Sequence, residues 1–183
     1  MGVKGRGSIA LLLVVAAVLL RPWDSGPARR LLRQASAPEA SERLTGRVVR
    51  AVDGDTLEVR LDDGDVETVR LIGVDTPETV KPDTPVQCFG PRASAFEHRT
   101  VEGRRVRLLV GVEPRDYYGR LLAYVWVDHP GWRPRRERFL EVELLRRGLA
   151  RTLTFHPNDR FAHKFAELER NSARAGKGLW NAC

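Results

Sequence analysis

Cysteine, histidine and aromatic residues are scarce in this chain. Its 183 residues include two cysteines, four histidines and only 7% aromatic residues. Two cysteines exclude both a disulfide-dense small scaffold and a zinc site built mainly from cysteine. A single long apolar run excludes a membrane protein with several spanning helices. The 42% of hydrophobic and 30% of charged residues are typical of a soluble globular protein.

The apolar run Ile9–Leu20 follows two basic residues near the start of the chain. A helix of this length would span about 18 Å, against about 30 Å of bilayer hydrocarbon. That length favours a secretory signal, with an uncleaved membrane anchor or a buried core helix as alternatives. We therefore interpret residues 1–23 as a signal peptide or membrane anchor and 24–43 as a linker. Residues 44–183 would then form a domain outside the cytoplasm, either secreted or tethered to the membrane through residues 9–20.

The formal net charge of +7 is unevenly distributed. Residues 1–43 carry seven Lys or Arg residues and three acids, so more than half of the excess lies before the domain. The basic balance is therefore a weak indication of a nucleic-acid partner. Function has to be argued from a site rather than from bulk charge.

Short β-prone runs separated by tight turns begin the domain. They predict strands at Arg47–Val52, Thr56–Leu61 and Val66–Leu71, then at Val106–Val112 and Leu121–Val127. A first helix is expected from Pro91 to about Glu102, with Ala93, Phe96 and Thr100 buried. A second is expected at Phe139–Arg147. A third is expected after a cap at Asp159, with Phe161, Phe165 and Leu168 on one face. The fold class expected is α+β, mainly β: a five-stranded Greek-key barrel of the OB type with about three helices.

Four short segments carry groups suited to phosphodiester chemistry. They are Asp53–Thr56, Arg70, Val74–Glu78 and Asp116–Arg120. Carboxylates on turns are ligands for Ca²⁺ or Mg²⁺, and such an ion can help to activate water. Two arginines match phosphate oxygens, and a further carboxylate could take a proton from water or orient it. Together these groups are what hydrolysis of a phosphodiester bond requires.

Each segment also has a simpler interpretation. Asp-Gly-Asp is more often a hairpin turn than a metal site, and Asp-Thr-Pro-Glu is as often a helix cap or turn. Arg70 could form an ion pair at the barrel rim, and Arg120 could be a solvated turn residue. The four histidines lack i, i+4 metal spacing, so we interpret them as surface or packing residues.

The order of three motifs distinguishes between these interpretations. Val52–Thr56, Arg70–Thr79 and Tyr118–Arg120 together resemble the staphylococcal nuclease (thermonuclease) family, over about residues 44–182. The resemblance implies an OB barrel with helices and an enzyme that cuts DNA and RNA to fragments ending in 3′-phosphate.

The resemblance also implies a role for each motif residue. Asp55 and Asp75 would bind Ca²⁺ through their side chains, and Thr76 would bind it through its backbone carbonyl. Glu78 would act as general base or orient the attacking water. Arg70 and Arg120 would clamp the phosphate, and Tyr118 would contact a terminal phosphate or pack beside the nucleotide.

Two positions depart from the family pattern. Tyr117 stands where the family has a lysine, and no tyrosine follows the Gly148-Leu149-Ala150 segment. Phe155 could stack on a base, although such a residue is more often part of the core. Base preference and the balance of exo- and endonuclease activity therefore stay open.

The two cysteines suggest one further hypothesis. In an exported protein an even pair can form a bridge, and Cys88 and Cys183 would enclose a span of 95 residues. Chain entropy alone would then stabilise the fold by about 4–5 kcal/mol. We expect a monomer. The alternative to an enzyme is a non-catalytic OB-type nucleic-acid-binding module, but its metal carboxylates, if uncompensated, would repel phosphate.

Overall fold

The computed structural model describes residues 42–79, 85–128 and 137–183. Residues 41–183 form one compact unit. The apolar run at 9–20 and the expected linker as far as residue 41 lie outside the described residues, whereas Arg43, the last residue assigned to the linker, already begins the first strand. Within the described ranges, no helix combines the length and the apolar character needed to cross a membrane.

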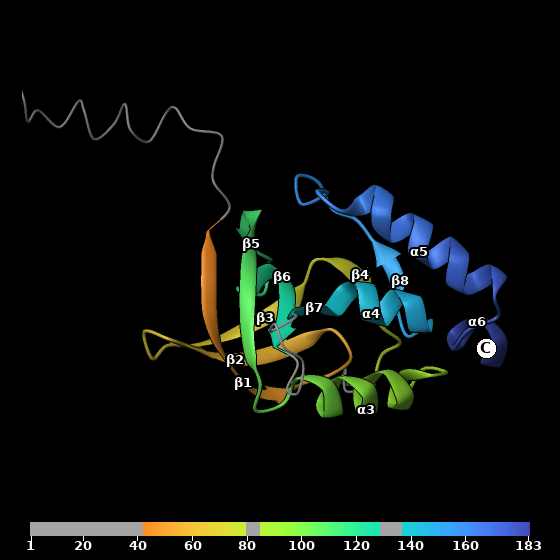
Figure 1. The fold of residues 1–183 in the computed structure, drawn as a ribbon, viewed down its shortest axis with the longest axis horizontal. Coiled ribbons are helices and arrows are strands. Elements are labelled where there is room, and N and C mark those ends of the chain that lie inside the picture. The colour runs from red at the N-terminus through yellow and green to blue at the C-terminus, as the bar shows by residue number, and fades with distance from the viewer. Residues whose placement is uncertain (1–41, 80–84, 129–136) are drawn as a thin grey trace, which may run out of the picture. The chain divides into compact units, whose positions relative to one another are not determined.

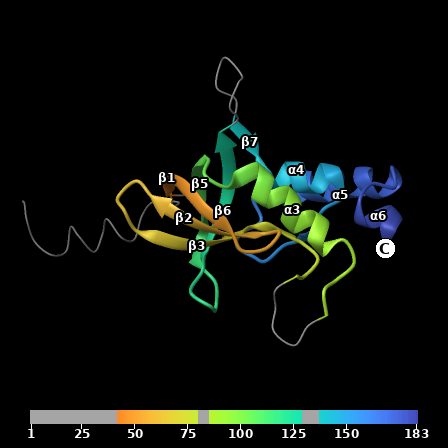
Figure 2. The same cartoon turned by 90° about the horizontal axis from the view of Figure 1, so that it is seen from below.

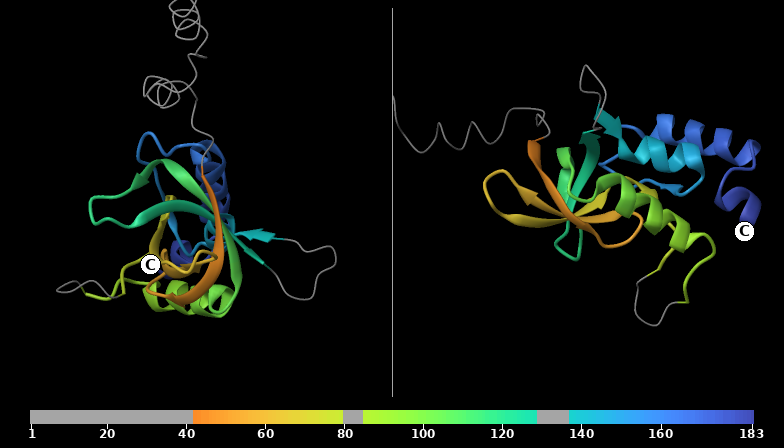
Figure 3. Two further views of the ribbon diagram at one scale, coloured as in Figure 1. Left: turned by 90° about the vertical axis from the view of Figure 1, so that its left-hand side faces the viewer. Right: turned by 60° about the horizontal axis from the view of Figure 1, so that its bottom comes forward.

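Five strands close into a barrel. They are β1 (Arg43–Ala51), β2 (Thr56–Leu61), β3 (Val66–Leu71), β5 (Arg105–Arg115) and β6 (Leu121–Asp128). Neighbours pair antiparallel in the order β3-β2-β1-β5-β6, and a parallel pairing between β3 and β6 closes the ring. Figure 3 shows the strands wrapping around one another. The OB-type barrel expected from the sequence is confirmed.

Three short strands among the described residues lie outside the five barrel strands and were not predicted. β7 (Glu137–Phe139) pairs with the end of β6. β4 (Gly73–Asp75) and β8 (Arg151–Leu153) form a separate two-stranded sheet. Each has only three residues, which is too short for an alternating pattern to stand out in a sequence. The β4–β8 pair fixes the segment that carries Asp75.

Four helices accompany the barrel in the part of the chain that the structure describes. They are α3 (Gly90–Val101), α4 (Leu140–Arg147), α5 (Ala162–Arg174) and the one-turn α6 (Leu179–Ala182). Figures 1 and 2 show α4, α5 and α6 gathered on one side of the molecule, beyond the barrel strands. α4 ends at Gly148, whose φ of 65° is the left-handed conformation that glycine adopts readily. This is the stop that the sequence predicts.

The core follows the periodicity of each element. Leu57, Val59 and Leu61 of β2 are buried, whereas Arg60 between them is exposed, as expected for a strand with one face inward. Phe165 of α5 is also buried, with Phe161 and Leu168 packed beside it, so the predicted face of this helix is confirmed.

Two details of the helices differ from the sequence-based expectation. The buried residues of α3 include Glu97 and Val101 beside Ala93, whereas Phe96 and Thr100 are only half-buried. The buried face of α3 is therefore rotated from the one predicted, because the sequence-based prediction did not place a glutamate in the core.

The start of α5 was also predicted wrongly. Its N-cap residue is Phe161, with no side-chain cap, so Asp159 does not cap the helix. The backbone carbonyl of Asp159 accepts the amide of Ala162, and its carboxylate pairs with His156 at 2.8 Å.

A disulfide joins Cys88 to Cys183, with their Cα atoms 5.9 Å apart. It links the end of α6 to the residue that precedes Phe89, the N-cap of α3. The helical side of the molecule is thus tied to the entry of α3, which comes after the Arg70–Thr79 motif in the chain.

Candidate active site

Asp55 lies in the turn between β1 and β2 and is 6% exposed. One of its carboxylate oxygens accepts the amide of Thr76 at 2.8 Å and the hydroxyl of Thr76 at 3.1 Å. The other lies 3.2 Å from the hydroxyl of Thr56 and 3.2 Å from Nε of Arg70. A Cβ at Gly54 would lie 2.6 Å from Oγ1 of Thr76, so this close approach requires glycine. Two motifs distant in sequence therefore meet at one carboxylate.

Arg70, near the end of β3, connects that carboxylate to a second one. Its Nη2 donates to Asp75 at 3.0 Å, while Nε faces Asp55. Its Nη1 donates to the carbonyls of Leu71 and Val74, each at 2.8 Å. The Arg70 side chain is 13% exposed and that of Asp75 is 54% exposed. One rigidly held guanidinium thus bridges a buried carboxylate and a solvent-facing one.

A third carboxylate, that of Asp53, lies in the same turn as Asp55, between β1 and β2. The amide of Asp55 donates to Asp53 at 3.0 Å. Burial, and then the neighbouring charge of Asp55, raise the pKa of Asp53. Asp53 therefore holds its proton more tightly than a free carboxyl does, because a second negative charge next to Asp55 in a buried turn is unfavourable.

The donors around Asp55 fit a hard cation. Among residues 42–79, 85–128 and 137–183, no three His, Cys, Asp or Glu side chains form a group that could hold a metal. Asp55 and Asp75 nevertheless supply two carboxylates to one neighbourhood, and calcium sites complete such a set with backbone carbonyls and water. The residues present therefore suit calcium or magnesium better than zinc.

Glu78 lies at the entry to α3. Its carboxylate accepts the amide of Thr79 at 2.8 Å. Its own amide donates to the side chain of Gln87 at 3.1 Å, and the amide of Gln87 donates back to its carbonyl at 2.9 Å. The backbone on either side of Glu78 is therefore fixed, two residues beyond Thr76.

Arg120 is held by a turn built around Asp116, between β5 and β6. The Asp116 carboxylate accepts Nε of Arg120 at 2.7 Å and the amides of Tyr118 and Arg120, each at 2.9 Å. The guanidinium of Arg120 lies 5.3 Å from the centre of the Tyr118 ring. Gly119 within this turn has a φ of 80°, which favours glycine. Asp116 had no role in the sequence-based prediction, although its i, i+4 spacing to Arg120 is visible there.

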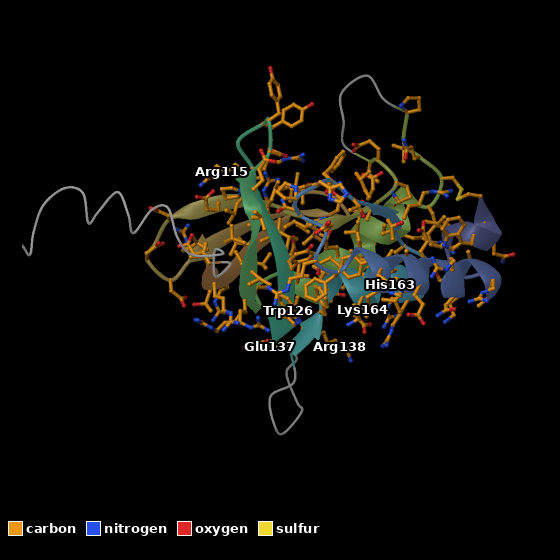
Figure 4. All side chains as sticks on the ribbon, turned by 90° about the horizontal axis from the view of Figure 1, so that it is seen from above. Arg115, Trp126, Glu137, Arg138, His163 and Lys164 are labelled. Carbon is orange, nitrogen blue, oxygen red and sulfur yellow. A yellow bond between two sulfur atoms is a disulfide. The ribbon has the colours of Figure 1, made fainter. Side chains whose placement is uncertain are left out.

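A cavity of about 550 Å³ brings the two arginines together. Arg70, Arg120, Tyr118 and Phe155 are all among the residues that line it. The cavity is not lined by Asp55, Asp75, Thr76 or Glu78. Asp55 and Asp75 are connected to it because both contact Arg70, and Thr76 is connected because it contacts Asp55. Arg115 also lines this cavity, and Figure 4 shows it on the opposite edge of the molecule from Trp126, Glu137 and Lys164.

Comparison with known proteins identifies relatives of this chain. The family model for staphylococcal nuclease homologues matches residues 68–182. A thermonuclease of Staphylococcus hyicus is 38% identical over 175 residues, which is 93% of this chain and 95% of the relative. The chain belongs to the staphylococcal nuclease family.

Other relatives extend this result. A thermonuclease of Staphylococcus intermedius is 42% identical over 133 residues, covering 73% of this chain and 74% of the relative. The endonuclease YncB of Bacillus subtilis strain 168 is 38% identical over 135 residues, covering 72% of this chain and 59% of the relative. The staphylococcal nuclease family thus accounts for most of the described domain.

The positions that depart from the family pattern lie at the cavity. Tyr117, in place of the family's lysine, is 98% exposed, and Tyr118 is 80% exposed. Phe155 is 69% exposed and lines the cavity, so the expectation that it belongs to the core was wrong. Phe155 follows β8 and belongs to no helix or strand that packs on the core, so its side chain stays outside the core. His156 also lines the cavity and is exposed, in keeping with a surface residue.

Two buried acids of this staphylococcal nuclease family member were not predicted from the sequence. Glu97 of α3 and Glu141 of α4 are both fully buried. The carboxylate of Glu141 accepts the amide of Val125 at 3.0 Å. Neither oxygen of Glu97 receives a hydrogen bond from the described residues. Burial, and then the charge of Asp55, raise the pKa of Glu97 well above its ordinary value.

Proposed function

We propose that this protein is a calcium-dependent nuclease that hydrolyses phosphodiester bonds of DNA and RNA and leaves 3′-phosphate ends. One observation carries the proposal: Arg70 contacts both Asp55 and Asp75 and shares a cavity with Arg120. The relatives named thermonuclease support the same activity. A module that only binds nucleic acid has no use for carboxylates beside its phosphate-binding arginines, because they repel phosphate.

Calcium would be held by the side chains of Asp55 and Asp75 and by the backbone carbonyl of Thr76. When bound, the ion would withdraw charge from a phosphodiester oxygen and lower the pKa of water. The hydrogen bonds from Thr76 and Thr56 keep Asp55 in one orientation without neutralising it. A ligand fixed in this way loses little conformational entropy when the cation arrives.

The two arginines would stabilise the phosphate during reaction. Arg70 presents its planar N–H donors from β3 and Arg120 from the turn before β6, and Asp116 keeps Arg120 from rotating. Their charge would match the additional negative charge of five-coordinate phosphorus. Tyr118, beside Arg120, would contact a terminal phosphate or pack beside the nucleotide.

Glu78 would take a proton from the attacking water or orient it. The water oxygen forms a bond to phosphorus, and the bond from phosphorus to the 5′-oxygen breaks. The electron pair leaves with that 5′-oxygen, which takes a proton from solvent. The phosphate stays on the 3′-oxygen, which accounts for the proposed product.

The location of the protein is part of the proposal. We infer that residues 1–23 direct the chain out of the cytoplasm, so that residues 44–183 act as a secreted or membrane-anchored monomeric domain. The disulfide between Cys88 and Cys183 supports this location, because such bonds persist in oxidising compartments.

The test is incubation of the full chain with DNA or RNA and with calcium, magnesium or EDTA, followed by end-group analysis. We expect cleavage of both polymers with calcium, 3′-phosphate ends, and no cleavage in EDTA. Full activity in EDTA or 5′-phosphate ends would contradict the proposal. Binding without cleavage under every condition would favour the non-catalytic module instead.

A matched pair of variants tests the calcium ligands. By calorimetry, Asp75→Asn should bind calcium more weakly than the parent, whereas Asp65→Asn, in the exposed turn before β3, should bind it as the parent does. Equal affinity in Asp75→Asn and the parent would overturn the ligand assignment.

A further inference from the structure

A second cavity lies on the helical side of the molecule. It has a volume of about 780 Å³ and is lined by residues of α3, α4 and the segment before α6. It shares no lining residue with the cavity that holds Arg70 and Arg120. Every charged residue that lines it within the described part of the chain is basic. We call this surface the basic groove, and its charged residues are Arg92, Arg99, Arg146, Arg147 and Lys177.

The cations of the basic groove are exposed and poorly matched by acids. Arg147 pairs with Glu143 at 3.2 Å, with half of its side chain still exposed. Within the described ranges, no carboxylate lies in ion-pair distance of the other four cations. Five like charges around one concave surface repel one another and raise the local concentration of anions.

Two aromatic rings support the guanidinium groups. The guanidinium carbon of Arg92 lies 5.0 Å from the centre of the Phe89 ring, and that of Arg147 lies 4.9 Å from the centre of the Phe96 ring. A guanidinium over a ring keeps its N–H edges free for an anion and is partly ordered before binding. Arg92 is therefore prepared for phosphate oxygens, and Arg147 offers them the donors that its one bond to Glu143 leaves over.

Helix stability accounts for only some of these charges. Arg99, Arg146 and Arg147 occupy the last turns of α3 and α4, where cations interact favourably with the helix dipole. Arg92 lies in the first turn of α3, where a cation is unfavourable, and that turn contains no acid. A ligand with negative charge explains this residue, whereas helix stabilisation does not.

The walls of the basic groove are held together. The amide of Leu179 donates to the carbonyl of Gly148 at 2.9 Å. A Cβ at Gly178 would clash with that carbonyl oxygen, so the backbones after α4 and before α6 touch directly. The disulfide between Cys88 and Cys183 ties α6 to the start of α3. The cations of three elements therefore keep their spacing in the absence of a ligand.

We propose that the basic groove binds the phosphate backbone of a nucleic-acid strand, outside the catalytic cavity. The identity of the strand as substrate rests on the proposed function; the recognition of phosphate rests on the groove itself. An extended strand whose scissile bond lies between Arg70 and Arg120 would continue onto the helical side. The groove would then raise affinity for long strands and leave the chemistry on short ones unchanged.

The decisive variant removes three charges from three elements: Arg92→Gln, Arg147→Gln and Lys177→Gln together. Its control removes three exposed arginines outside the groove: Arg60→Gln, Arg170→Gln and Arg174→Gln. The net charge changes equally in both. Thermal melts establish that all the proteins are folded. If the triple variant is not folded, the double variant Arg99→Gln with Arg146→Gln replaces it.

Binding is measured by fluorescence anisotropy on the full chain in EDTA, with a labelled single strand of about 30 nucleotides, over a range of salt concentrations. The groove variant should bind about tenfold more weakly at low salt, and its slope of log affinity against log salt should fall by about 2, because each phosphate contact contributes about 0.7 for a single strand. The control should keep the parent slope. An unchanged slope in the groove variant, or an equal loss in the control, would overturn the proposal.

Cleavage separates this proposal from the proposed function. With calcium, the groove variant should lose kcat/KM on the long strand and keep the parent rate on a dinucleotide. If the parent cleaves nothing, the proposed function fails, while the anisotropy result still decides the groove. Anionic phosphatidylglycerol vesicles test the other polyanionic surface: a variant that loses vesicle binding and keeps oligonucleotide binding would show that the groove serves a membrane, and would refute our assignment.

Discussion

The active-site cavity and the basic groove hold their arginines in different ways. Arg70 and Arg120 are each fixed by carboxylates at hydrogen-bonding distance. Arg92 and Arg147 rest on phenylalanine rings; Arg92 has no ion pair among the described residues, and Arg147 has one, to Glu143, with half of its side chain exposed. A carboxylate fixes both the position and the direction of a guanidinium, as transition-state stabilisation demands. A ring supports the group and leaves its net charge uncompensated, which suits capture of a polyanion.

The largest effect expected from this comparison is on turnover. Arg120→Ala should lower the rate on any substrate by two to three decades, about 2.7–4 kcal/mol in barrier height, because a donor to a charged transition state is lost. The loss should be the same for a dinucleotide and a long strand. The control is Arg50→Ala, an exposed arginine paired with Glu58 outside the cavity. Turnover close to that of the parent in Arg120→Ala would remove the distinction between the two regions.

The next largest effect concerns the frame of the basic groove. Replacing Cys88 and Cys183 together by serine should lower the free energy of unfolding by about 2–4 kcal/mol, the range typical of disulfides and somewhat below the about 4–5 kcal/mol that chain entropy alone gives for a 95-residue loop. Urea denaturation measures the change. In the folded variant, affinity for a long strand should fall more than the rate on a dinucleotide. An unchanged urea midpoint would show that the bond does not constrain this side of the molecule.

A smaller effect concerns the buried acid behind the active site. The pKa of Glu97 is raised well above its ordinary value of 4.5 when the chain is folded. The folded carboxyl therefore holds its proton more tightly than the unfolded one. Its contribution to stability is fully present below about pH 4.5 and is lost as the pH rises toward the folded pKa, by up to about 1.4 kcal/mol per pH unit.

Glu97→Gln should remove this dependence and be more stable than the parent at about pH 8. Urea denaturation from about pH 5 to about pH 8 provides the measurement, with the exposed Glu167→Gln of α5 as control. Parallel stability curves for Glu97→Gln and the parent would mean that Glu97 ionises as readily in the folded chain as in the unfolded one. The basic groove contains no comparable acid among its lining residues.

The smallest effect tests the aromatic support itself. Phe96→Leu removes the ring beneath Arg147 and keeps an apolar side chain against the core. Loss of one exposed cation–π contact, worth about 0.5–1 kcal/mol, should weaken binding of a long strand by about two- to fivefold. Anisotropy in EDTA measures this change, with thermal melts in parallel. Full affinity in a stable Phe96→Leu protein would show that the ring does not prepare the arginine for phosphate.

Much of the fold was predictable because its signals are local. A β-prone run between two tight turns predicted β2 at its observed bounds, and Gly148 predicted the end of α4. Strands of three residues and the start of α5 carried no such signal. Glu97 was assigned no place in the core, because a charged residue on an amphipathic helix is normally on its solvent face.

The sequence by itself determined the chemical inventory of this protein: carboxylates in turns, two arginines in neighbouring motifs, and short β-prone runs separated by tight turns. Tertiary structure alone decided which groups meet. Asp55 reaches Arg70 and Thr76 because β1, β2 and β3 bring their ends together, and the basic groove exists because α3, α4 and the segment before α6 are packed and covalently tied. Side-chain type is local information, whereas distance between residues far apart in the chain depends on how the whole core packs.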